Sequence, residues 1–236
     1  MRKETGKVPK HIGIILDGNR RFAKRLMMKP WKGHEWGEKK LEPLLEWCKD
    51  YKINELTLYT FSIENFDRPK KEFEYLMDVF RKGFDKWMNN PKIMNEGVKV
   101  NFIGRTWMLP KDIQEKMKRF SEKTKKNSSF ILNFAMAYGG RAEIIDAVKK
   151  ISKEIKKGKL SVDEVNEEVF SNNLYNKSEP DLIIRTGGEQ RLSGFLLWQG
   201  AYAEIFWVEN LWPEFSKKDF VNALKSYSKR ERRFGK

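Results

Sequence analysis

The residues best suited to chemistry follow a short apolar run near the start of the chain. Ile12–Arg21 has the sequence IGIILDGNRR, so the apolar run ends at Asp17 and a Gly-Asn pair and two arginines follow. An apolar run of this length predicts a buried strand, and the Gly-Asn pair predicts a sharp turn into a helix. The N–H groups at the start of that helix, with Arg20 and Arg21, would attract an anion. Asp17 has the wrong charge for that anion, which is explained if a metal ion lies between them.

Arginines recur at or just after the ends of the predicted strands. They are Arg21, Arg68, Arg185 and Arg191. Such arginines would repel one another unless they share anions, and guanidinium groups suit bidentate phosphate contacts. Each arginine–phosphate contact is worth roughly 1.5–3 kcal/mol, against about 0.3–2 kcal/mol for the helix dipole. With neutral donors from Thr186, the Gly187-Gly188 backbone and Ser193, we expect room for more than one phosphate group.

Glu204 is the single charged residue in the intensely apolar segment 195–208. A carboxylate is costly to bury there unless it is paired or bound to a metal ion. An ion pair with an arginine is the general expectation. Because Mg2+ takes one or two carboxylates together with phosphate oxygens, Asp17 and Glu204 could instead share one ion.

Strand and helix patterns alternate along the chain, with no linker, low-complexity segment or repeat. Six segments are predicted to be strands: 12–17, 55–61, 98–103, 130–137, 181–184 and 205–208. Seven are predicted to be helices: 20–28, 34–51, 71–89, 111–125, 142–156, 161–175 and 216–233. The alternation predicts one α/β domain over residues 1–236, with short basic tails and a six-stranded, mostly parallel sheet flanked by helices. The carboxyl edge of that sheet would collect Asp17 and the arginine-bearing loops.

The helix predicted over 71–89 has a long, wide and aromatic apolar face. Its members are Phe73, Leu76, Met77, Phe80, Phe84, Trp87 and Met88. Core packing is the usual role of such a stripe. The alternative, that part of the stripe lines an apolar cavity, stays open from the sequence.

Composition and charge narrow the classes of function. Of 236 residues, 39% are hydrophobic, so a sizeable core is possible and wholesale disorder is excluded. The formal net charge of +15 implies an anionic partner, which could be nucleic acid, a membrane surface or a phosphorylated small molecule. Neither a signal peptide nor a membrane span is found, which predicts a cytosolic protein with at most a peripheral membrane contact.

Several other kinds of site are disfavoured. The sequence has no Walker A loop, no G-x-G-x-x-G after a strand and no strong nucleophile signature. Cys48, the only cysteine, falls on the apolar face of a predicted helix and is expected to be a buried thiol. His11 is expected to be an ordinary strand-edge residue, whereas a polar role for His34 near Asp17 is as plausible as a structural one.

Four blocks of residues resemble the motifs of the cis-prenyltransferases, the family of undecaprenyl and dehydrodolichyl diphosphate synthases. The blocks are Asp17-Gly18-Asn19-x-Arg21, Ser62-x-Glu64-Asn65-x-x-Arg68-Pro69, Tyr138-Gly139-Gly140-Arg141 and Asp181-Leu182-Ile183-Ile184-Arg185-Thr186-Gly187-Gly188-Glu189-x-Arg191-x-Ser193. The similarity runs from about residue 11 to residue 235, nearly the whole chain. The last block is long and highly specific, so chance agreement is improbable.

The resemblance implies a homodimeric fold with an apolar product tunnel, one wall of which would be the aromatic face of the helix over 71–89. The segment 195–208 would belong to the dimer interface. The implied reaction is an Mg2+-dependent, repeated condensation of isopentenyl diphosphate onto an allylic diphosphate starter. Its product would be a long polycis-polyprenyl diphosphate, the precursor of a glycosyl carrier lipid, and product release could involve a peripheral membrane contact. Nucleic acid is not an expected partner.

The family's site residues carry over position by position. Asp17 would hold Mg2+ and assist loss of the allylic diphosphate, with Asn65 as a second catalytic candidate and Glu204 as a second carboxylate near the metal. The starter diphosphate would be bound by Gly18, Asn19, Arg21 and Arg68, with further substrate contacts from Arg20, Phe22 and His34. Isopentenyl diphosphate would be bound by Arg185, Arg191 and Ser193. The loop that closes over the substrates would contain Ser62, Glu64, Asn65 and Phe66, and the partner subunit would reach the site through Arg233 and Gly235.

Some positions depart from the commonest family pattern. Arg20 stands where a glycine is usual, Pro30 where an arginine often helps to hold the starter, and Gln190 where a histidine is frequent. Phe22 and Phe66 replace tryptophans. The starter, farnesyl or geranylgeranyl diphosphate, stays open, and product length is not readable from the sequence. The general base also stays open among Asn19, His34, Ser62 and the released diphosphate.

Two rival interpretations come from other classes. A nucleic-acid-binding protein would explain the positive charge, but the arginines cluster at predicted strand ends next to acids and no nucleic-acid-reading motif is present. A catalytically silent partner subunit would share the fold, but such subunits lack the DGNxR and RTGGExR residues that this chain keeps.

Overall fold

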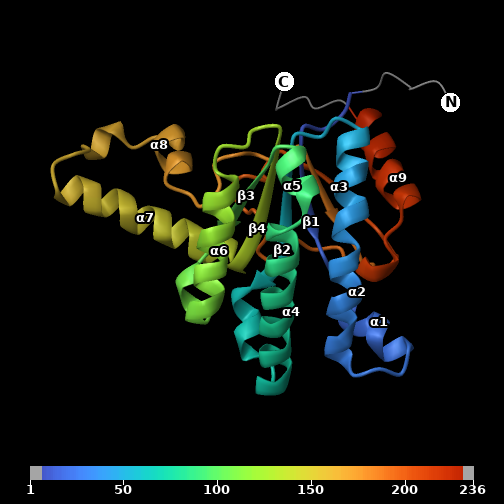
Figure 1. The fold of residues 1–236 in the computed structure, drawn as a ribbon. Coiled ribbons are helices and arrows are strands. Elements are labelled where there is room, and N and C mark those ends of the chain that lie inside the picture. The colour runs from blue at the N-terminus through green and yellow to red at the C-terminus, as the bar shows by residue number, and fades with distance from the viewer. Residues whose placement is uncertain (1–6, 231–236) are drawn as a thin grey trace.

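Within residues 7–230, the apolar runs become six strands of one sheet (Figure 1). The computed structural model describes residues 7–230. The strands are β1 (His11–Ile15), β2 (Glu55–Ser62), β3 (Val98–Ile103), β4 (Phe130–Tyr138), β5 (Leu182–Arg185) and β6 (Glu204–Trp207). Their order across the sheet is β3-β4-β2-β1-β5-β6, and every pairing is parallel. All six carboxyl ends therefore lie at one edge, and the predicted mostly parallel sheet is confirmed as an all-parallel one.

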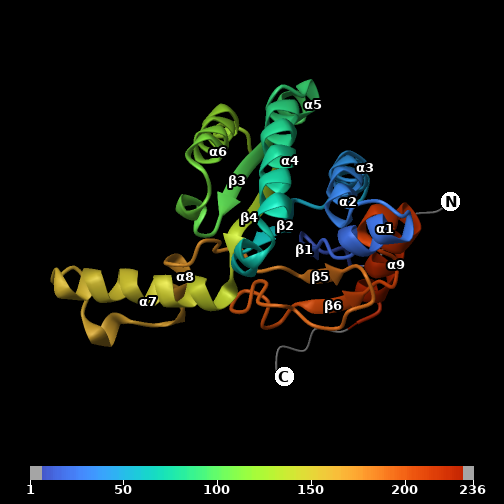
Figure 2. The same ribbon diagram turned by 90° about the horizontal axis from the view of Figure 1, so that it is seen from below.

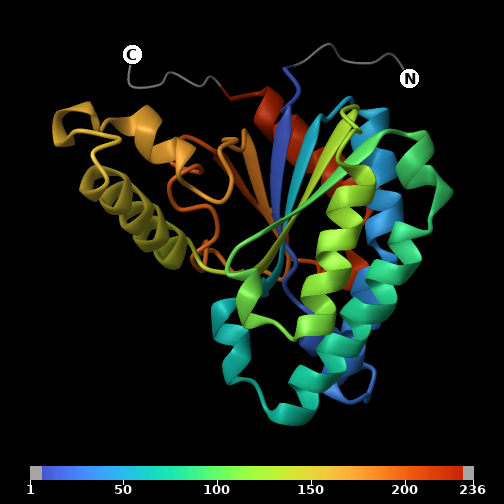
Figure 3. The same ribbon diagram turned by 60° about the vertical axis from the view of Figure 1, so that its left-hand side comes forward.

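Helices cover the sheet on both sides (Figures 2 and 3). They are α1 (Asn19–Arg25), α2 (Gly33–Lys39), α3 (Leu41–Asp50), α4 (Lys70–Met88), α5 (Pro91–Asn95), α6 (Lys111–Thr124), α7 (Gly140–Lys156), α8 (Glu167–Asn172) and α9 (Lys217–Ser228). In the views, α3, α4, α6 and α9 lie along one side, whereas α7 and α8 extend away from the other. Within residues 7–230, no helix is both long and apolar enough to cross a bilayer.

The two faces of the sheet are buried unequally. Alternate residues of β1, Ile12 and Ile14, belong to a large apolar cluster that includes side chains of α3, α4, α6 and α9. On the opposite face, Ile15 and Ile183 belong to a smaller cluster with Phe195 from the chain after β5. Because strand residues alternate between faces, the near-continuous apolar runs of β1 and β5 reflect burial on both sides.

Two predicted helices are each divided in the structure. The predicted helix 34–51 is broken at Lys40 into α2 and α3, because Pro43 has no N–H with which to bond the Lys39 carbonyl. The predicted helix 161–175 is a 3-10 turn (Val162–Glu164) followed by α8, because Asn166 is extended and its side chain accepts from the Val169 N–H at 2.9 Å. Both errors come from single residues that interrupt the backbone hydrogen bonding of an otherwise helical pattern.

Two sequence expectations about buried residues have different outcomes. Cys48 is fully buried, as predicted. His11 lies at the amino end of β1, as expected, but its side chain is buried, and Nε2 lies 2.8 Å from Thr57 Oγ1. The burial follows from strand order, because β1 lies between β2 and β5.

Candidate active site

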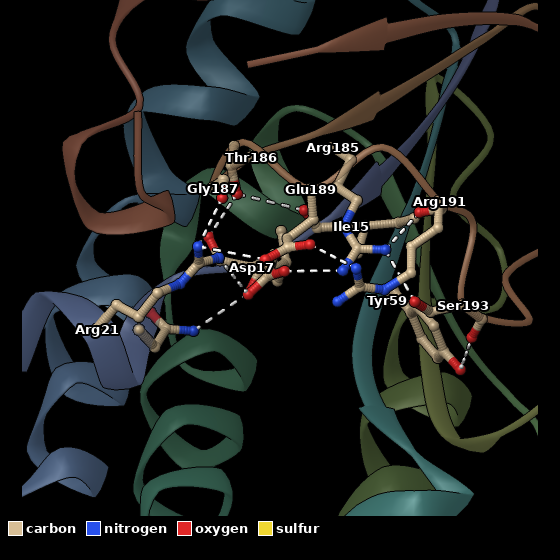
Figure 4. Close-up of polar contacts among 12 residues, drawn as sticks. Ile15, Asp17, Arg21, Tyr59, Arg185, Thr186, Gly187, Glu189, Arg191 and Ser193 are labelled. Atoms are coloured by element: carbon tan, nitrogen blue, oxygen red, sulfur yellow. Dashed lines mark hydrogen bonds and ion pairs between the residues drawn. The ribbon is translucent and has the colours of Figure 1, made fainter. Parts of the chain in front are cut away.

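The carboxyl edge of the sheet places Asp17 between two arginines. Asp17 follows β1, and Gly18 takes a positive φ of 114° as the chain turns into α1. A Cβ at position 18 would lie 2.8 Å from Leu211 Cβ, so no side chain fits there. Arg185 Nη2 donates to Asp17 Oδ2 at 2.8 Å, and Arg21 Nη2 lies 3.1 Å from Asp17 Oδ1 (Figure 4). The acid is thus held by one arginine from β5 and one from α1.

The chain after β5 folds back onto Arg185. Arg185 donates from Nη1 to Ser193 Oγ at 2.8 Å and to the carbonyl oxygen of Arg191, and its side chain is only 5% exposed. The guanidinium of Arg191 is exposed and pairs with Glu189 (Figure 4). We call Asp17, Arg185, Arg191 and Ser193 the strand-end half-site.

Left-handed backbone shapes this loop. Gly187, Gly188 and Gly194 have φ of 87°, 75° and 80°, and Ser193 has φ of 49°. A Cβ at Gly187 would clash with the guanidinium of Arg21, whose Nη1 donates to the Gly187 carbonyl at 2.7 Å. Glycine at position 187 is therefore needed both for the turn and for the close approach of Arg21.

A second cationic cluster lies at the starts of α1 and α4. Arg68 Nη1 donates to Glu72 Oε1 at 2.9 Å, and Arg20 Nε lies 3.5 Å from the same oxygen. Arg68 Nη1 also lies 3.4 Å from His34 Nε2. Burial, with Arg68 and Arg20 nearby, lowers the pKa of His34 to about 3, so this imidazole is neutral near pH 7. We call Arg20, His34, Arg68 and Glu72 the helix-end half-site.

The segment that leads to Arg68 is a short 3-10 turn, Ile63–Asp67. The Ser62 N–H donates to Asn65 Oδ1 at 3.1 Å, which fixes the start of the turn. Phe66 packs edge-on against Phe61 with 5.1 Å between ring centroids, and Glu64 is exposed. Asn65 therefore has a clear local role in shaping this loop, and its catalytic role stays a prediction.

A cavity of about 280 Å³ joins the two half-sites to an apolar wall. Its polar lining includes Asp17, Asn19, His34, Ser62, Asn65, Arg68 and Arg185. Its lining from α4 comprises Leu76, Val79, Phe80, Gly83, Phe84 and Trp87. Leu76 and Trp87 are eleven residues apart, so this wall is roughly 16 Å long at 1.5 Å per helical residue. The aromatic stripe of α4 therefore both packs in the core and lines a cavity, whereas a continuous product tunnel stays a prediction.

Glu204 does not join Asp17 within the chain. It begins β6 opposite Leu182, at the amino edge of the sheet, whereas Asp17 follows the carboxyl end of β1. Glu204 is level with Leu182 and Ile12 across the sheet, and Asp17 lies five residues beyond Ile12, about 16 Å along the strand direction. Glu204 Oε2 instead accepts from Arg230 Nη1 at 2.7 Å. The expected ion pair with an arginine is confirmed. Asp17 and Glu204 of one chain lie too far apart to share an ion, so Glu204 as a metal ligand stays a prediction.

The remaining predicted residues have mixed positions. Asn19 lines the cavity, and its Oδ1 is buried without a hydrogen-bond partner among residues 7–230. Phe22 packs against Trp36 with 5.6 Å between ring centroids and does not line the cavity. Arg233 and Gly235 lie outside the described residues, so their predicted role at the partner's site stays a prediction.

Glu72 is a residue that the motifs did not indicate. Its carboxylate is 2% exposed and contacts two arginines. The signal was present in the sequence, because Glu72, Leu76, Phe80 and Phe84 follow one another at intervals of four residues. An acid that continues an apolar stripe needs a buried partner, so its position pointed to an ion pair.

At the carboxyl edge of the all-parallel sheet, an arginine-lined mouth opens into an apolar cavity. This arrangement is typical of a protein that binds a phosphorylated, largely apolar molecule. The family model described as "Putative undecaprenyl diphosphate synthase" matches residues 15–235. The chain belongs to this family of prenyltransferases, so the predicted family and enzyme class are confirmed.

Relatives and solved structures agree with this assignment. The tritrans,polycis-undecaprenyl-diphosphate synthase (geranylgeranyl-diphosphate specific) of Pyrococcus horikoshii is 47% identical over 235 residues, which cover 99% of this chain and 89% of that protein. The protein of the same name from Methanocaldococcus jannaschii is 44% identical over 233 residues, which cover 97% of this chain and 83% of that protein.

Two crystal structures of synthases in this family have the same fold. Lavandulyl diphosphate synthase from Lavandula x intermedia, in complex with dimethylallyl diphosphate, has a TM-score of 0.93 and 32% identity, covering 97% of this chain and 99% of that chain. A probable undecaprenyl diphosphate synthase from Campylobacter jejuni has a TM-score of 0.81 and 35% identity, covering 98% of this chain and 100% of that chain. The predicted fold class is confirmed.

Proposed function

We propose that the chain condenses isopentenyl diphosphate repeatedly onto geranylgeranyl diphosphate, giving a long polycis-polyprenyl diphosphate. The observation that carries this proposal is the cavity, which has arginines at one end and the aromatic wall of α4 along its side. The relatives from Pyrococcus horikoshii and Methanocaldococcus jannaschii are named geranylgeranyl-diphosphate specific, which supports that starter over farnesyl diphosphate.

The two half-sites suit the two diphosphates. In the proposed arrangement, the starter diphosphate lies at Arg68 of the helix-end half-site, with its hydrocarbon tail against α4. Arg21, which pairs with Asp17 and belongs to neither half-site, is its second arginine. Isopentenyl diphosphate lies at Arg185, Arg191 and Ser193 of the strand-end half-site. The C1–O bond of the starter breaks, and its electron pair leaves with the diphosphate. Arginines stabilise the departing charge, and the apolar wall keeps water away from the allylic cation.

The carbon–carbon bond then forms between C1 of the starter and C4 of isopentenyl diphosphate, and a proton is lost from C2 of the added unit. His34 is neutral near pH 7 because its pKa is lowered to about 3, so it could accept a proton, although its Nε2 already faces Arg68. The base stays open among His34, Asn19, Ser62 and the released diphosphate.

Asp17 fits a role in holding Mg2+. Its carboxylate lies in the cavity lining, and its charge is balanced by two guanidiniums. Residues 7–230 contain no cluster of three or more acidic, histidine or cysteine side chains that could hold a metal ion, so most ligands would have to be substrate phosphates and water. One carboxylate with phosphate oxygens is a common Mg2+ environment. When bound, the ion would neutralise charge on the departing diphosphate.

A homodimer is part of the same proposal. β6 is an edge strand of half-buried residues, and Ile145 and Val148 on α7 are exposed, as is Tyr202 between β5 and β6. A second copy would cover these apolar groups, as the family resemblance implies. A peripheral membrane contact during product release stays a prediction.

The test is a radiolabel assay with purified protein, Mg2+, labelled isopentenyl diphosphate and one starter at a time. We expect long hydrophobic products and a higher kcat/KM with geranylgeranyl than with farnesyl diphosphate. Removal of Mg2+ with EDTA should abolish incorporation. No incorporation with any C10–C20 starter would contradict the proposed function, whereas equal kcat/KM values would contradict only the starter.

A further inference from the structure

Glu72 is a buried acid placed between two arginines that come from different elements. It lies in the first turn of α4, and its Oε1 is 2.9 Å from Nη1 of Arg68 and 3.5 Å from Nε of Arg20. Glu72 is 2% exposed, Arg68 is 22% exposed and Arg20 is 48% exposed. A buried carboxylate is stable only when it is paired, so this contact is a built feature of the site and not a surface ion pair.

Arg20 links two elements that are far apart in the sequence. It belongs to α1, directly after the Asp17 turn, whereas Glu72 belongs to α4. The contact therefore joins the element that follows Asp17 to the element that follows the 3-10 turn Ile63–Asp67. This gives a role to the arginine that stands where the family usually has glycine.

Glu72 also decides where the Arg68 guanidinium lies. Arg68 is the residue directly after the 3-10 turn, and its side chain lines the cavity. The start of the turn is fixed by Ser62 and Asn65, and its end has the Glu72 contact. A second hydrogen-bonding neighbour of the guanidinium, the neutral ring of His34, lies farther away at 3.4 Å and offers no charge.

We propose that Glu72 is a positioning residue that holds Arg68 at the cavity mouth, and that Arg20 completes this contact by tying α1 to α4. The proposal rests on the proposed function only in naming the ligand, the allylic starter diphosphate. The shared carboxylate compensates one of the two positive charges, so the cluster keeps a net charge of +1 toward the mouth. Loss of Glu72 would leave two neighbouring guanidiniums that repel each other, with Arg68 free to turn away.

The main test is Glu72→Gln, which keeps the size of the side chain and removes its charge. The starter KM should rise about tenfold, because one charge-assisted hydrogen bond is lost. The isopentenyl diphosphate KM should change less than about twofold. Arg20→Gln should raise the starter KM in the same direction by a smaller factor. Because Arg20 is half-exposed, this second variant folds even if the buried substitution does not.

Arg25→Gln is the matched control. Arg25 also belongs to α1, also pairs with an acid from another element, Glu214, and is exposed to a similar degree, but its partner acid is not part of the helix-end half-site. It should leave both KM values unchanged. Thermal unfolding of all variants separates a general loss of stability from a change in substrate binding.

Calorimetric titration with geranylgeranyl diphosphate measures the same effect without turnover. If the natural chain binds the starter but Glu72→Gln leaves the starter Kd unchanged, or raises both KM values equally, the positioning role is wrong.

The Arg20→Gln/Glu72→Gln double variant should bind the starter as weakly as Glu72→Gln alone. Additive losses would show that Arg20 contacts the diphosphate directly, which contradicts its proposed role through Glu72. If the natural chain neither binds nor elongates the starter, both this inference and the proposed function are wrong, whereas binding without elongation contradicts the function alone.

Discussion

The two half-sites hold their arginines in different ways. Arg185 belongs to β5, which is paired on both sides, and its almost buried guanidinium reaches Asp17 and Ser193. Arg68 follows a 3-10 turn, and its guanidinium is oriented by one buried acid. An interior strand moves only with the sheet, whereas a turn and a helix start can shift through a few backbone dihedrals.

The difference suggests a division of roles. The strand-end half-site is already assembled by contacts within the protein, so we expect its geometry to change little when a substrate binds. The helix-end half-site depends on side chains from α1, α2 and α4, so we expect it to adjust to the starter. Substitutions in the strand-end half-site should therefore affect the chemical step or the affinity for isopentenyl diphosphate, and substitutions in the helix-end half-site should mainly affect starter affinity.

The largest expected effect is that of Asp17→Ala. Its carboxylate contacts both Arg21 and Arg185 and is the proposed Mg2+ ligand, so removing it should lower kcat about a thousandfold, or about 4 kcal/mol. Circular dichroism and size-exclusion chromatography should show an unchanged fold and assembly. Asp163→Ala, at an exposed acid far along the chain, is the control. Near-normal turnover of Asp17→Ala would contradict the metal assignment and the central place of Asp17.

Arg68→Gln and Arg191→Gln compare the half-sites directly. Each removes one charge-assisted phosphate contact worth roughly 1.5–3 kcal/mol, so one KM should rise about ten- to a hundredfold. For Arg68→Gln that KM is the starter's, and for Arg191→Gln it is that of isopentenyl diphosphate. Steady-state kinetics with each substrate varied in turn measures both. If either variant raises both KM values equally, the assignment of one diphosphate to each half-site is wrong.

The helix-end half-site should also be the acid-sensitive one. Burial, with Arg68 and Arg20, lowers the pKa of His34 from 6.5 to about 3, so the unfolded chain binds this proton more readily than the folded one. The contribution of the neutral His34 ring to folding stability is fully present above pH 6.5, the pKa of histidine in the unfolded chain. It is lost as the pH falls from 6.5 toward 3. At pH 5 the loss is about 2 kcal/mol. Urea unfolding at pH 7 and pH 5 should show this loss in the natural chain and a smaller one in His34→Gln. An equal loss in both would mean that other groups cause the acid sensitivity.

The smallest expected effect is that of Ser193→Ala. The change removes the hydroxyl that accepts from Arg185 at 2.8 Å, a contact worth about 1 kcal/mol. The isopentenyl diphosphate KM should rise about fivefold and the starter KM should stay the same. Ser152→Ala, at an exposed position on α7, should change neither. A rise in the starter KM alone would place Ser193 at the other half-site.

Sequence patterns predicted the fold well where the signal is local. The strand predicted over 98–103 has the same limits as β3, and the helix predicted over 111–125 differs from α6 by one residue. The pattern failed at Pro43 and Asn166, where one residue changes the backbone hydrogen bonding without changing the apolar spacing. It also missed the short helix α5, which depends on the Asn90 cap.

The sequence by itself determined the family, the parallel α/β class and the position of Asp17 and the arginines at strand ends, because these follow from motif spacing and from local periodicity. Only the tertiary structure decided which acid each arginine meets. Asp17 and Arg185 are 168 positions apart, and they meet because β5 lies beside β1. The register of β6 against β5 likewise placed Glu204 at the amino edge of the sheet, and the packing of α1 near α4 joined Arg20 to Glu72. Contacts of this range depend on which elements become neighbours, and no local pattern in the chain encodes that.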